Sequence, residues 1–363
     1  MAQELSPLDS AHRAAGAKLI DFAGWSLPVR FGSDLAEHHA VRQAAGLFDL
    51  SHMAQLAVEG PGAGQALDYA LMGRHAAMAL GRAAYSMVLA PDGGVIDDLI
   101  VYRLAQERFF IIANAANRHA VVEALAQRLA GFAAELADAT LSRALIAVQG
   151  PRSVEIMLAA GAPQAAALGY YWAAETEIAG RPVILAHTGY TGETGFEISC
   201  DRAAAADLWD RLLRAGEPLG LVRCGLAARD TLRLEAAMPL YGHELDRYTT
   251  PAEGGQGAFV RPKAADFVGR AGLAARGAPR QHLVGLVGQG RRAARAGYTV
   301  LVGGEPRGRV TSGALSPTLG RPIALARLDG SPPPLGTEVQ VDVRGQLAPY
   351  QVAALPFYTK EKK

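Results

Sequence analysis

The chain has 363 residues, with 36 basic and 35 acidic side chains and a formal net charge of +1. Half of its residues are hydrophobic and a fifth are charged, a composition that fills real cores and excludes a disordered chain. The near-neutral charge argues against a protein that coats DNA or an anionic membrane, because such proteins carry a basic excess. Two cysteines, Cys200 and Cys224, exclude a disulfide framework and a cysteine-ligated zinc or iron–sulfur site. At typical domain size, this length predicts two or three domains.

The first residues show neither a basic region nor an apolar run, so the pattern predicts no secretory signal. The longest uncharged stretch, residues 156–174, is interrupted by the turn signal Gly161-Ala162-Pro163-Gln164. That interruption predicts a buried segment rather than a membrane span. We therefore expect a soluble, cytoplasmic protein.

Two early segments share one pattern: a hydrophobic strand, a Gly-Pro pair and a helix. The first covers residues 56–71 and the second residues 146–158. The prolines, Pro61 and Pro151, are expected in the first helical turn, where a missing N–H costs nothing. The match indicates either a duplicated unit in two related α+β domains or a chance similarity in an alanine-rich chain.

Between these segments, Pro91-Asp92-Gly93-Gly94 is a strong hairpin signal that joins the expected strands 85–90 and 95–104. Further elements follow from apolar spacing: strands at 109–113, 183–185 and 196–198, and helices at 120–132, 203–213 and 226–238.

After about Gly277 the chain changes to short strands separated by turns rich in Gly and Pro. These strands are expected at 282–287, 298–302, 309–311, 323–327 and 339–343. The spacing is typical of a small all-β barrel or sandwich. The chain is thus predicted to hold two interleaved α+β domains followed by a β domain.

Two patterns imitate ligand sites. Gly60-Pro61-Gly62-Ala63-Gly64-Gln65 suggests a dinucleotide-binding loop, but the third glycine of that fingerprint falls at Gln65 and no strand–helix series surrounds it. His38 and His39 stand beside Glu37, yet adjacent helical residues point about 100° apart, which makes a shared metal unfavourable. We interpret both histidines as structural or surface residues.

Asp97-Asp98 is the sharpest local signal for chemistry. In the expected strand 95–104 side chains alternate between faces, so Asp98 shares its face with Ile100 and Tyr102. A carboxylate in an apolar row needs a partner, a cavity or a ligand. We therefore expect a functional Asp98, and an exposed Asp97 nearer the turn.

Asn114 closes the neighbouring strand and Tyr85 opens the hairpin. Each of them either lines a cavity beside Asp98 or merely caps its element. Residues 187–197 form a glycine-punctuated loop that enters a strand, and such glycines let a backbone approach a flat ligand. Glu197 in that strand is out of phase with its apolar neighbours, so it either faces the ligand or lies on an exposed edge.

The predicted helix beginning after Gly225 places Asp230 in the apolar stripe with Leu226 and Leu234. Asp230 then either pairs with Arg233 to hold the helix or serves a ligand. Arg229, at the margin of the stripe, is better placed than Asp230 and Arg233 to meet a ligand.

The order of motifs along the whole chain resembles the glycine cleavage system T-protein (aminomethyltransferase) family. The resemblance is carried by Phe22-Ala23-Gly24-Trp25, Glu37-His38-His39-Ala40-Val41-Arg42, Gly46-Leu47-Phe48-Asp49-Leu50-Ser51-His52-Met53, Asp97-Asp98-Leu99-Ile100-Val101-Tyr102, Asn114-Ala115-Ala116-Asn117, Thr188-Gly189-Tyr190-Thr191-Gly192-Glu193, Ala228-Arg229-Asp230-Thr231-Leu232-Arg233-Leu234-Glu235, Tyr241-Gly242, Thr311-Ser312-Gly313, Ser316-Pro317-Thr318-Leu319 and Pro356-Phe357-Tyr358. Each motif alone is weak, and their order is specific.

The resemblance implies an α+β fold in a three-domain ring, or cloverleaf, with tetrahydrofolate in its centre. Two interleaved domains with antiparallel sheets would take residues 1–53 with 141–276, which bind folate, and residues 54–140, which carry the Asp98 hairpin. Residues 277–363 would form a C-terminal β-barrel or jelly-roll-like domain.

The resemblance also implies a reaction. The aminomethyl group on the dihydrolipoyl arm of lipoylated H-protein passes to tetrahydrofolate, which yields 5,10-methylenetetrahydrofolate and ammonia. No metal or NAD is called for, because no electrons are transferred. The implied partners are H-protein and folate, with neither nucleic acid nor membrane. The alternatives are a related folate-dependent demethylase and a non-enzymatic folate-binding protein.

Site residues follow from the same resemblance. Asp98 matches the catalytic carboxylate, which stabilises developing positive charge and relays a proton. Glu197 suits the two parallel donors on the pterin edge. The remaining matches surround the pterin and the reacting centre or contact the folate: Tyr85, Tyr102, Asn114, Tyr190, Met53 and Arg229.

Some positions depart from the family pattern. His187 replaces a more common arginine, Ala227 a glycine, and Ala258 with Phe259 a tryptophan. These departures bear on H-protein docking and helix approach more than on the chemistry. A basic cluster at Arg291, Arg292 and Arg295 is interpreted as a solvated face, with a folate tail or an acidic partner as the alternative.

Overall fold

The computed structural model describes residues 3–259 and 266–360. The chain divides into two compact units. The first unit comprises Met1–Val88 and Asp98–Arg229, and the second comprises Leu89–Asp97 and Asp230–Lys363. Within the described ranges, no helix has both the length and the apolar character needed to span a membrane.

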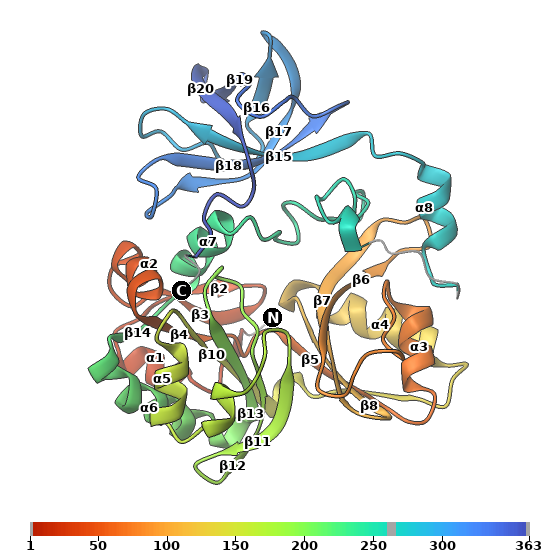
Figure 1. The fold of residues 1–363 in the computed structure, drawn as a ribbon, viewed down its shortest axis with the longest axis vertical. Helices are drawn as coiled ribbons and strands as arrows, with labels where there is room; N and C mark the ends of the chain where they lie inside the picture. Colours follow the sequence, from red (N-terminus) through yellow and green to blue (C-terminus); the bar gives the residue numbers. More distant parts are fainter. Residues whose placement is uncertain (1–2, 260–265, 361–363) are drawn as a thin grey trace. The chain divides into compact units, whose positions relative to one another are not determined.

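A six-stranded sheet lies in the first unit, in the order β11-β12-β13-β10-β4-β14 (Figure 1). Its strands are β4 (Ala45–Asp49), β10 (Arg143–Gln149), β11 (Ala173–Ile178), β12 (Arg181–Ala186), β13 (Gly195–Asp201) and β14 (Leu221–Arg223). Neighbouring strands are antiparallel except β14, which runs parallel to β4. One face carries α5 (Ser153–Ala159) and α6 (Ala205–Gly216), where Phe196, Ile198 and Trp209 share one buried cluster. Glu197 therefore points to the opposite face, as its phase predicts.

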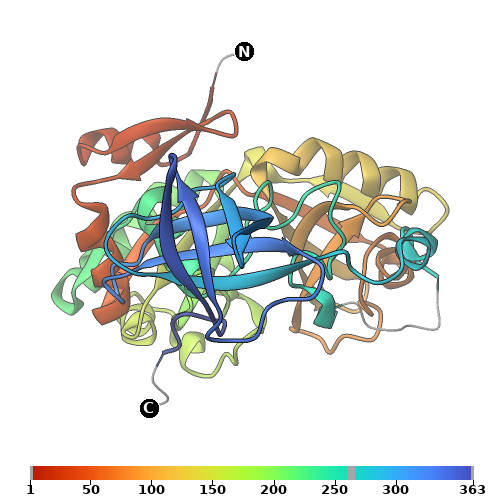
Figure 2. The same ribbon diagram turned by 90° about the horizontal axis from the view of Figure 1, so that it is seen from above.

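A five-stranded sheet has the order β6-β7-β8-β5-β9. Its strands are β5 (Ala54–Glu59), β6 (Ala83–Leu89), β7 (Val95–Ala105), β8 (Arg108–Ala113) and β9 (Glu135–Asp138). Helices α3 (Ala63–Ala70) and α4 (Arg118–Leu129) pack together beside this sheet, and Figure 2 shows α4 running along it. The predicted hairpin is confirmed, with the turn Pro91-Asp92-Gly93-Gly94 between β6 and β7.

The first unit begins with a small sheet in the order β1-β3-β2. It contains β1 (Glu4–Leu5), β2 (Lys18–Phe22) and β3 (Trp25–Arg30), with α1 (Asp9–Ala14) between β1 and β2 and α2 (Asp34–Gln43) after β3. The Ser33 hydroxyl accepts a hydrogen bond from the Ala36 amide at 3.3 Å, which caps α2.

The second unit contains a closed barrel in the order β15-β18-β17-β16-β19-β20. Its strands are β15 (Gln281–Gly288), β16 (Thr299–Val302), β17 (Glu305–Leu315), β18 (Pro322–Asp329), β19 (Glu338–Val343) and β20 (Gln346–Ala353). Helix α8 (Arg270–Arg276) precedes the barrel, and α7 (Leu226–Glu235) begins in the first unit and ends in the second. The expected α+β sheets and C-terminal barrel are confirmed.

Short 3-10 turns complete the architecture, at Ala115–Asn117, Thr140–Ser142, Pro163–Ala166, Arg202–Ala204, Glu217–Leu219 and Gly257–Phe259. All strands of the five-stranded sheet lie within residues 54–138, and the strands of the six-stranded sheet come from both sides of that stretch. The domain bounds given above stay a prediction.

Three expectations from sequence are wrong in detail. Pro61 and Pro151 do not lie in a first helical turn, because α3 and α5 begin two residues later, and each proline lies in the turn before its helix. Asp230 does not lie in the buried stripe of α7, since its side chain is 54% exposed. The last barrel strand, β20, was not predicted, because Leu347-Ala348-Pro349 breaks the alternation of polar and apolar residues and a proline is unusual inside a strand.

A buried ion pair joins α7 to the loop that precedes the barrel. Arg233 is 2% exposed, and its guanidinium lies 3.0 Å from the carboxylate of fully buried Glu244. It also donates to the Ser312 hydroxyl in β17 at 2.8 Å. Glu244 Oε1 has no hydrogen-bond partner among the described residues, so this carboxylate already depends on Arg233.

We predict that Arg233→Met lowers the free energy of unfolding by about 3–5 kcal/mol, because it leaves the Glu244 carboxylate buried without a cation. Urea unfolding followed by circular dichroism measures the change. Arg181→Met is the matched control, since Arg181 and Asp207 form an ion pair in which both side chains are more than half exposed. The control should lose no more than about 1 kcal/mol. Equal losses in the two variants would contradict the prediction.

Candidate functional site

Asp98 lies near the start of β7, where its carboxylate is held by two neutral donors. The Tyr85 hydroxyl in β6 donates to Asp98 Oδ2 at 2.9 Å. The Asn114 amide donates to Asp98 Oδ1 and to the Asp98 carbonyl oxygen, each at 3.0 Å. Tyr85 and Asn114 therefore both lie beside Asp98, and their role in lining a cavity there stays a prediction. The carboxylate is half-buried and fixed through both oxygens.

Strand register explains why these residues meet. Ala113 in β8 pairs with Leu99 in β7 on one side and with Ala54 in β5 on the other. Asp98 precedes Leu99, Met53 precedes Ala54 and Asn114 follows Ala113. In this antiparallel register the three residues lie together at one end of the sheet. Met53 is half-buried in the turn before β5, and its amide donates to the Leu50 carbonyl at 2.9 Å.

The pKa of Tyr85 is raised well above its ordinary value, first by burial and then by the negative charge of Asp98. Tyr85 thus stays protonated and remains a hydrogen-bond donor to Asp98. The rings of Tyr190 and Tyr171 add smaller contributions to the same shift, which places both near Tyr85.

Glu197 forms a second carboxylate centre, in β13. Its side chain is 8% exposed, which contradicts the alternative of an exposed strand edge. The Thr188 hydroxyl donates to Glu197 Oε2 at 2.5 Å, and the Tyr102 hydroxyl donates to the same oxygen at 3.4 Å. Both hydrogen bonds found within the described part of the chain use Oε2, so Oε1 keeps its capacity to accept donors.

The five-stranded and six-stranded sheets of the first unit contact each other here. Tyr102 in β7 reaches Glu197, and Ser199 in β13 donates to the Gln55 side chain of β5 at 2.5 Å. The pKa of Tyr102 is raised well above its ordinary value by burial and then by the charge of Glu197, so Tyr102 donates as a neutral phenol. Both carboxylate centres thus lie within the first unit, and these hydrogen bonds join its five-stranded and six-stranded sheets.

Tyr171 lies near enough to both carboxylates to feel their charge, and sequence reasoning missed it. Its pKa is raised by burial, then by Tyr170, Glu197 and Asp98, so both carboxylates act on its hydroxyl. Its backbone has φ of 61°, a left-handed conformation that a bulky residue rarely adopts. Strain of this kind persists where the surrounding structure imposes it, often at functional sites. No motif marks Tyr171, and only the fold places it here.

Arg229 and Tyr190 form a cation–π pair. The Arg229 guanidinium lies 4.6 Å from the centre of the Tyr190 ring, and both side chains are half-buried. The expectation that Arg229 lies at the margin of its helix is confirmed. Such stacking holds the plane of the guanidinium against the ring.

His52 lies beside this pair and was not singled out from sequence. Burial and then the positive charge of Arg229 lower the pKa of His52 to about 3, against a smaller opposing effect of Asp49. Its Nδ1 is buried and has no hydrogen-bond partner among the described residues. A neutral imidazole therefore lies next to the Arg229 guanidinium and adds no repulsive charge.

One expectation about the acidic pair is wrong. Asp97 is fully buried rather than exposed near the turn. Proximity to a turn in the sequence is a poor guide here, because β7 begins at Val95 and Asp97 is already inside the strand. Asp98 is the more accessible of the two carboxylates.

The positions that depart from the family pattern have structural explanations in part. His187 Nδ1 donates to the Leu168 carbonyl at 2.7 Å, and the His187 ring stacks on Phe196 with 4.8 Å between the ring centres. It therefore anchors the start of the 187–195 loop. Ala227 lies half-buried in the first turn of α7, and Ala258 lies in an exposed 3-10 turn.

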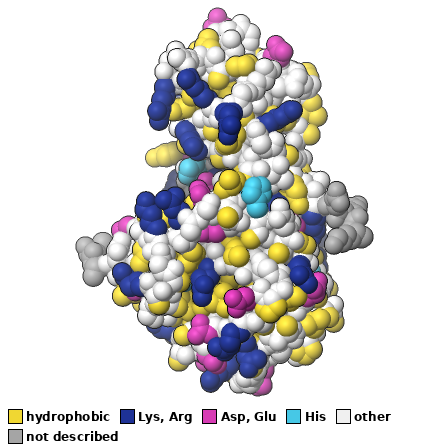
Figure 3. Space-filling model, turned by 90° about the vertical axis from the view of Figure 1, so that its left-hand side faces the viewer, with side chains coloured by type: hydrophobic (Ala, Val, Ile, Leu, Met, Phe, Trp, Pro, Cys, Tyr) yellow, Lys and Arg dark blue, Asp and Glu magenta, His cyan; other side chains and the backbone are white. Residues whose placement is uncertain are grey.

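The basic cluster Arg291, Arg292 and Arg295 is exposed, in keeping with the solvated face expected for it. Positively charged side chains are spread over the visible face of the barrel (Figure 3). Arg295 donates to the Gly313 carbonyl at 2.9 Å, and Arg292 donates to the Gln346 side chain.

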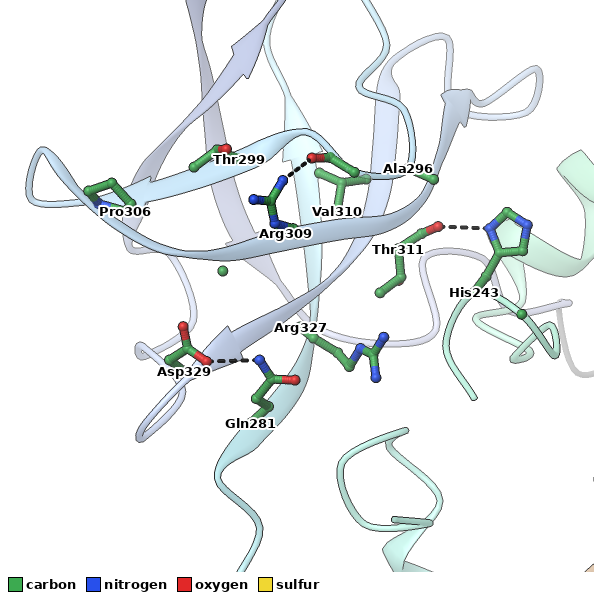
Figure 4. Close-up of a pocket in the computed structure, with 13 residues that line it drawn as sticks. His243, Gln281, Ala296, Thr299, Pro306, Arg309, Val310, Thr311, Arg327 and Asp329 are labelled. Carbon is green, nitrogen blue, oxygen red and sulfur yellow. Dashed lines mark hydrogen bonds between the residues drawn. The ribbon is translucent and has the colours of Figure 1, made fainter. Parts of the chain in front are cut away.

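A cavity of about 500 Å³ lies on the barrel, and several of the polar side chains that line it form hydrogen bonds within the protein (Figure 4). Gln281 donates to Asp329 at 2.8 Å, and the His243 ring bonds the Thr311 carbonyl at 2.9 Å. None of the described residues that line it is a site residue predicted from sequence. Elsewhere in the described ranges, no group of three or more His, Cys, Asp or Glu side chains could hold a metal ion.

Comparison with known proteins shows one family along the chain. Residues 8–264 match the family described as the GCVT N-terminal domain, and residues 281–359 match the glycine cleavage T-protein C-terminal barrel domain. The aminomethyltransferase of Streptomyces avermitilis is 52% identical, covering 98% of this chain and 97% of the relative. The aminomethyltransferase of Moorella thermoacetica is 44% identical, covering 99% and 98%. The crystal structure of glycine cleavage system aminomethyltransferase T from Bartonella henselae superposes with a TM-score of 0.91 at 37% identity, covering 98% of each chain.

The depressed pKa of His52 predicts a pH dependence of stability. In the unfolded chain His52 takes up a proton near its ordinary pKa of 6.5, whereas in the folded chain it stays neutral down to about pH 3. Between these values the unfolded state binds the extra proton, so the folded state loses stability as the pH falls. The wild-type chain should lose about 1.4 kcal/mol per pH unit relative to His52→Asn below pH 6.5.

Urea unfolding between pH 7.5 and pH 5 measures this difference. His119→Asn is the control, because His119 is exposed and its variant should follow the wild-type profile. Parallel pH profiles for the wild-type chain and His52→Asn would show that His52 titrates normally in the folded state.

Proposed function

Because the chain belongs to the glycine cleavage T-protein family of aminomethyltransferases, we propose that its first unit carries out one-carbon transfer at the paired Asp98 and Glu197 centres. The chain is an aminomethyltransferase. It passes the one-carbon unit of S-aminomethyldihydrolipoyl H-protein to tetrahydrofolate, which yields 5,10-methylenetetrahydrofolate and ammonia. The proposal assigns the donor to lipoylated H-protein and the acceptor to tetrahydrofolate.

The reaction defines what the site must supply. Two bonds to the carbon break, one to the lipoyl sulfur and one to the amine nitrogen, and two form, to N5 and N10 of the folate. The protons from N5 and N10 leave on the sulfur and the ammonia, so no electrons are transferred. Loss of either leaving group produces a cationic iminium. A fixed negative charge beside the folate nitrogens stabilises that cation, and a carboxylate can also carry a proton between them.

Asp98 is assigned this role. The single observation that carries the assignment is the fixation of both Asp98 oxygens by the neutral donors Tyr85 and Asn114. Neutral donors hold the carboxylate in place without cancelling its charge, and prior orientation of a charge removes the cost of reorganisation during the reaction. The raised pKa of Tyr85 keeps this arrangement intact at neutral pH.

Glu197 is assigned to the pterin ring. A pterin edge offers a ring N–H and an amino group, two parallel donors that one carboxylate can accept together. Thr188 and Tyr102 fix Oε2 of Glu197, while Oε1 keeps its capacity to accept. Burial of this carboxylate strengthens hydrogen bonds to it, because little water competes.

The other site residues complete a pocket for the folate. Tyr190 offers aromatic surface to a flat ring, buried Tyr102 contributes its hydrogen bond to Glu197, and Met53 adds a flexible apolar side chain at the Asp98 end of the sheet. Arg229, stacked on Tyr190, presents its N–H groups to the anionic portion of the substrate. No step of the proposed reaction requires a metal ion or a nicotinamide.

Asp98→Asn should keep the fold and tetrahydrofolate affinity but lower kcat by about 10²–10⁴, because asparagine has nearly the same shape and the Tyr85 hydroxyl can turn to accept from its amide, but it lacks the charge and the proton capacity. Formation of ammonia and methylenetetrahydrofolate from aminomethyl-loaded H-protein, with and without tetrahydrofolate, measures the rate. Glu107→Gln is the control, since Glu107 is exposed in the turn at the other end of β7. Unchanged turnover in Asp98→Asn would remove Asp98 from the mechanism. A demethylase would turn over without lipoylated protein, and a non-enzymatic folate binder would be indifferent to this change.

Glu197→Gln should weaken tetrahydrofolate binding by about 10- to 100-fold, because it removes a charged acceptor and sets an amide donor against the donors of the pterin edge. Titration calorimetry measures the dissociation constant. Glu177→Gln, an exposed change in β11 of the same sheet, should bind as the wild-type chain does. Equal affinity of Glu197→Gln and the wild-type chain would place the pterin elsewhere.

A further inference from the structure

Helix α2 carries Glu37 and Arg42, two charged residues of the motif series that take no part in the proposed chemistry. Glu37 is 4% exposed, and the Arg42 side chain is 5% exposed. Charged side chains are buried to this degree only when other groups satisfy them. The hydrogen-bond partners of Glu37 and Arg42 therefore indicate which segments α2 holds in place.

Glu37 holds the peptide from which α7 begins. Its Oε1 accepts from the Phe31 and Gly32 amides at 2.8 and 3.1 Å, and its Oε2 accepts from the Gly225 amide at 2.9 Å. The Gly225 carbonyl in turn accepts from the Arg229 amide at 3.2 Å, in the first turn of α7. One carboxylate thus ties the end of β3 to the helical turn that carries Arg229, and its charge favours this N-terminal position.

The Gly225 junction leaves little freedom of movement. A Cβ at Gly225 would lie 2.4 Å from the Val29 carbonyl carbon and oxygen, closer than real Cβ contacts allow. The start of α7 is therefore packed directly on the backbone of β3, and the Glu37 hydrogen bonds set the position of that contact.

Arg42 holds the other partner of the cation–π pair. Its guanidinium donates to the Thr191 carbonyl at 2.7 Å and to Glu193 at 2.9 Å, and the Glu193 side chain is 4% exposed. Thr191 directly follows Tyr190, and its hydroxyl donates to Gln149 at 2.9 Å. The loop segment bearing the Tyr190 ring is thereby attached to α2 on one side and to β10 on the other.

We propose that α2 is the positioning element of the Arg229–Tyr190 pair, with Glu37 and Arg42 as positioning residues for tetrahydrofolate binding. One rigid helix holds both segments, so it fixes the separation between the guanidinium and the ring. This inference rests on the proposed function, in which Arg229 and Tyr190 contact the folate. It assigns the Glu37 and Arg42 positions of the motif to substrate binding rather than to the chemical step, which belongs to Asp98.

The test compares four changes in the full-length chain: Glu37→Gln, the double variant Arg42→Met/Glu193→Gln, Arg229→Met, and Arg181→Met as the exposed control. The double variant removes both charges of the buried pair, so no carboxylate is stranded. Glu37→Gln and the double variant should each raise the KM for tetrahydrofolate about tenfold while kcat changes less than about twofold, because a misplaced binding group weakens ground state and transition state alike. Arg181→Met should leave both constants unchanged.

Coupling to Arg229 separates positioning from a general loss of structure. When Glu37→Gln is added to Arg229→Met, the further rise in KM should be less than about twofold, because the group that Glu37 positions is already absent. A tenfold rise in both backgrounds would overturn the inference. The inference would also be overturned if Arg229→Met raises the KM for tetrahydrofolate while Glu37→Gln and the double variant leave it unchanged. The proposed function would still stand in that case.

Hydrogen exchange without any substrate provides the independent measurement. Exchange of the Gly225 and Arg229 amides should accelerate at least about tenfold in Glu37→Gln, since each amide loses its fixed acceptor or its anchored partner. The amides of α4 should keep their wild-type rates. If Arg229→Met leaves KM unchanged, the proposed role of Arg229 fails, and exchange alone decides the role of α2: acceleration confined to the α7 start supports it, and unchanged exchange overturns it.

Discussion

The site depends on two carboxylates that are held out of bulk water by neutral hydrogen-bond donors. Asp98 is held by a phenol and an amide, and Glu197 by two hydroxyls. Removing a carboxylate from water is costly, and the cost falls when donors satisfy its oxygens. These donors carry no charge and so do not themselves neutralise the carboxylates, which fits the roles proposed for them beside a cationic intermediate and the donor edge of a pterin. Cations in the same places would satisfy the carboxylates equally well and cancel their charge.

Both carboxylates lie in the first unit, Asp98 on a strand of the five-stranded sheet and Glu197 on a strand of the six-stranded sheet. Glu197 belongs to a strand whose other face, with Phe196 and Ile198, is packed in a buried cluster. Tyr102 reaches it from the facing sheet across 95 positions of sequence. Tyr171, with its left-handed backbone, is influenced by both carboxylates. Strand alternation thus separates the residues that hold the fold from those left for the ligand.

The charged residues also divide into those that hold the fold together and those assigned to the ligand. Arg233 with Glu244, and Arg42 with Glu193, are buried ion pairs that tie elements together. Arg229 instead stacks on the face of Tyr190. Neutral His52 beside it avoids a second positive charge. A carboxylate partner occupies N–H groups of an arginine, whereas stacking on an aromatic face orients the guanidinium plane.

Local sequence determined much of this protein: the hairpin at Pro91-Asp92-Gly93-Gly94, the phase of Glu197, the change to short strands after Gly277, and the ordered motifs that match the family. These are properties of neighbouring residues, such as turn propensity and side-chain alternation, and they survive without knowledge of the fold. Tertiary structure alone decided that Asp97 is buried, that Asp230 is exposed, and that Tyr171 and His52 lie beside the site. Burial and pKa depend on atoms that arrive from distant segments, and no periodicity within one strand or helix records which segment will arrive.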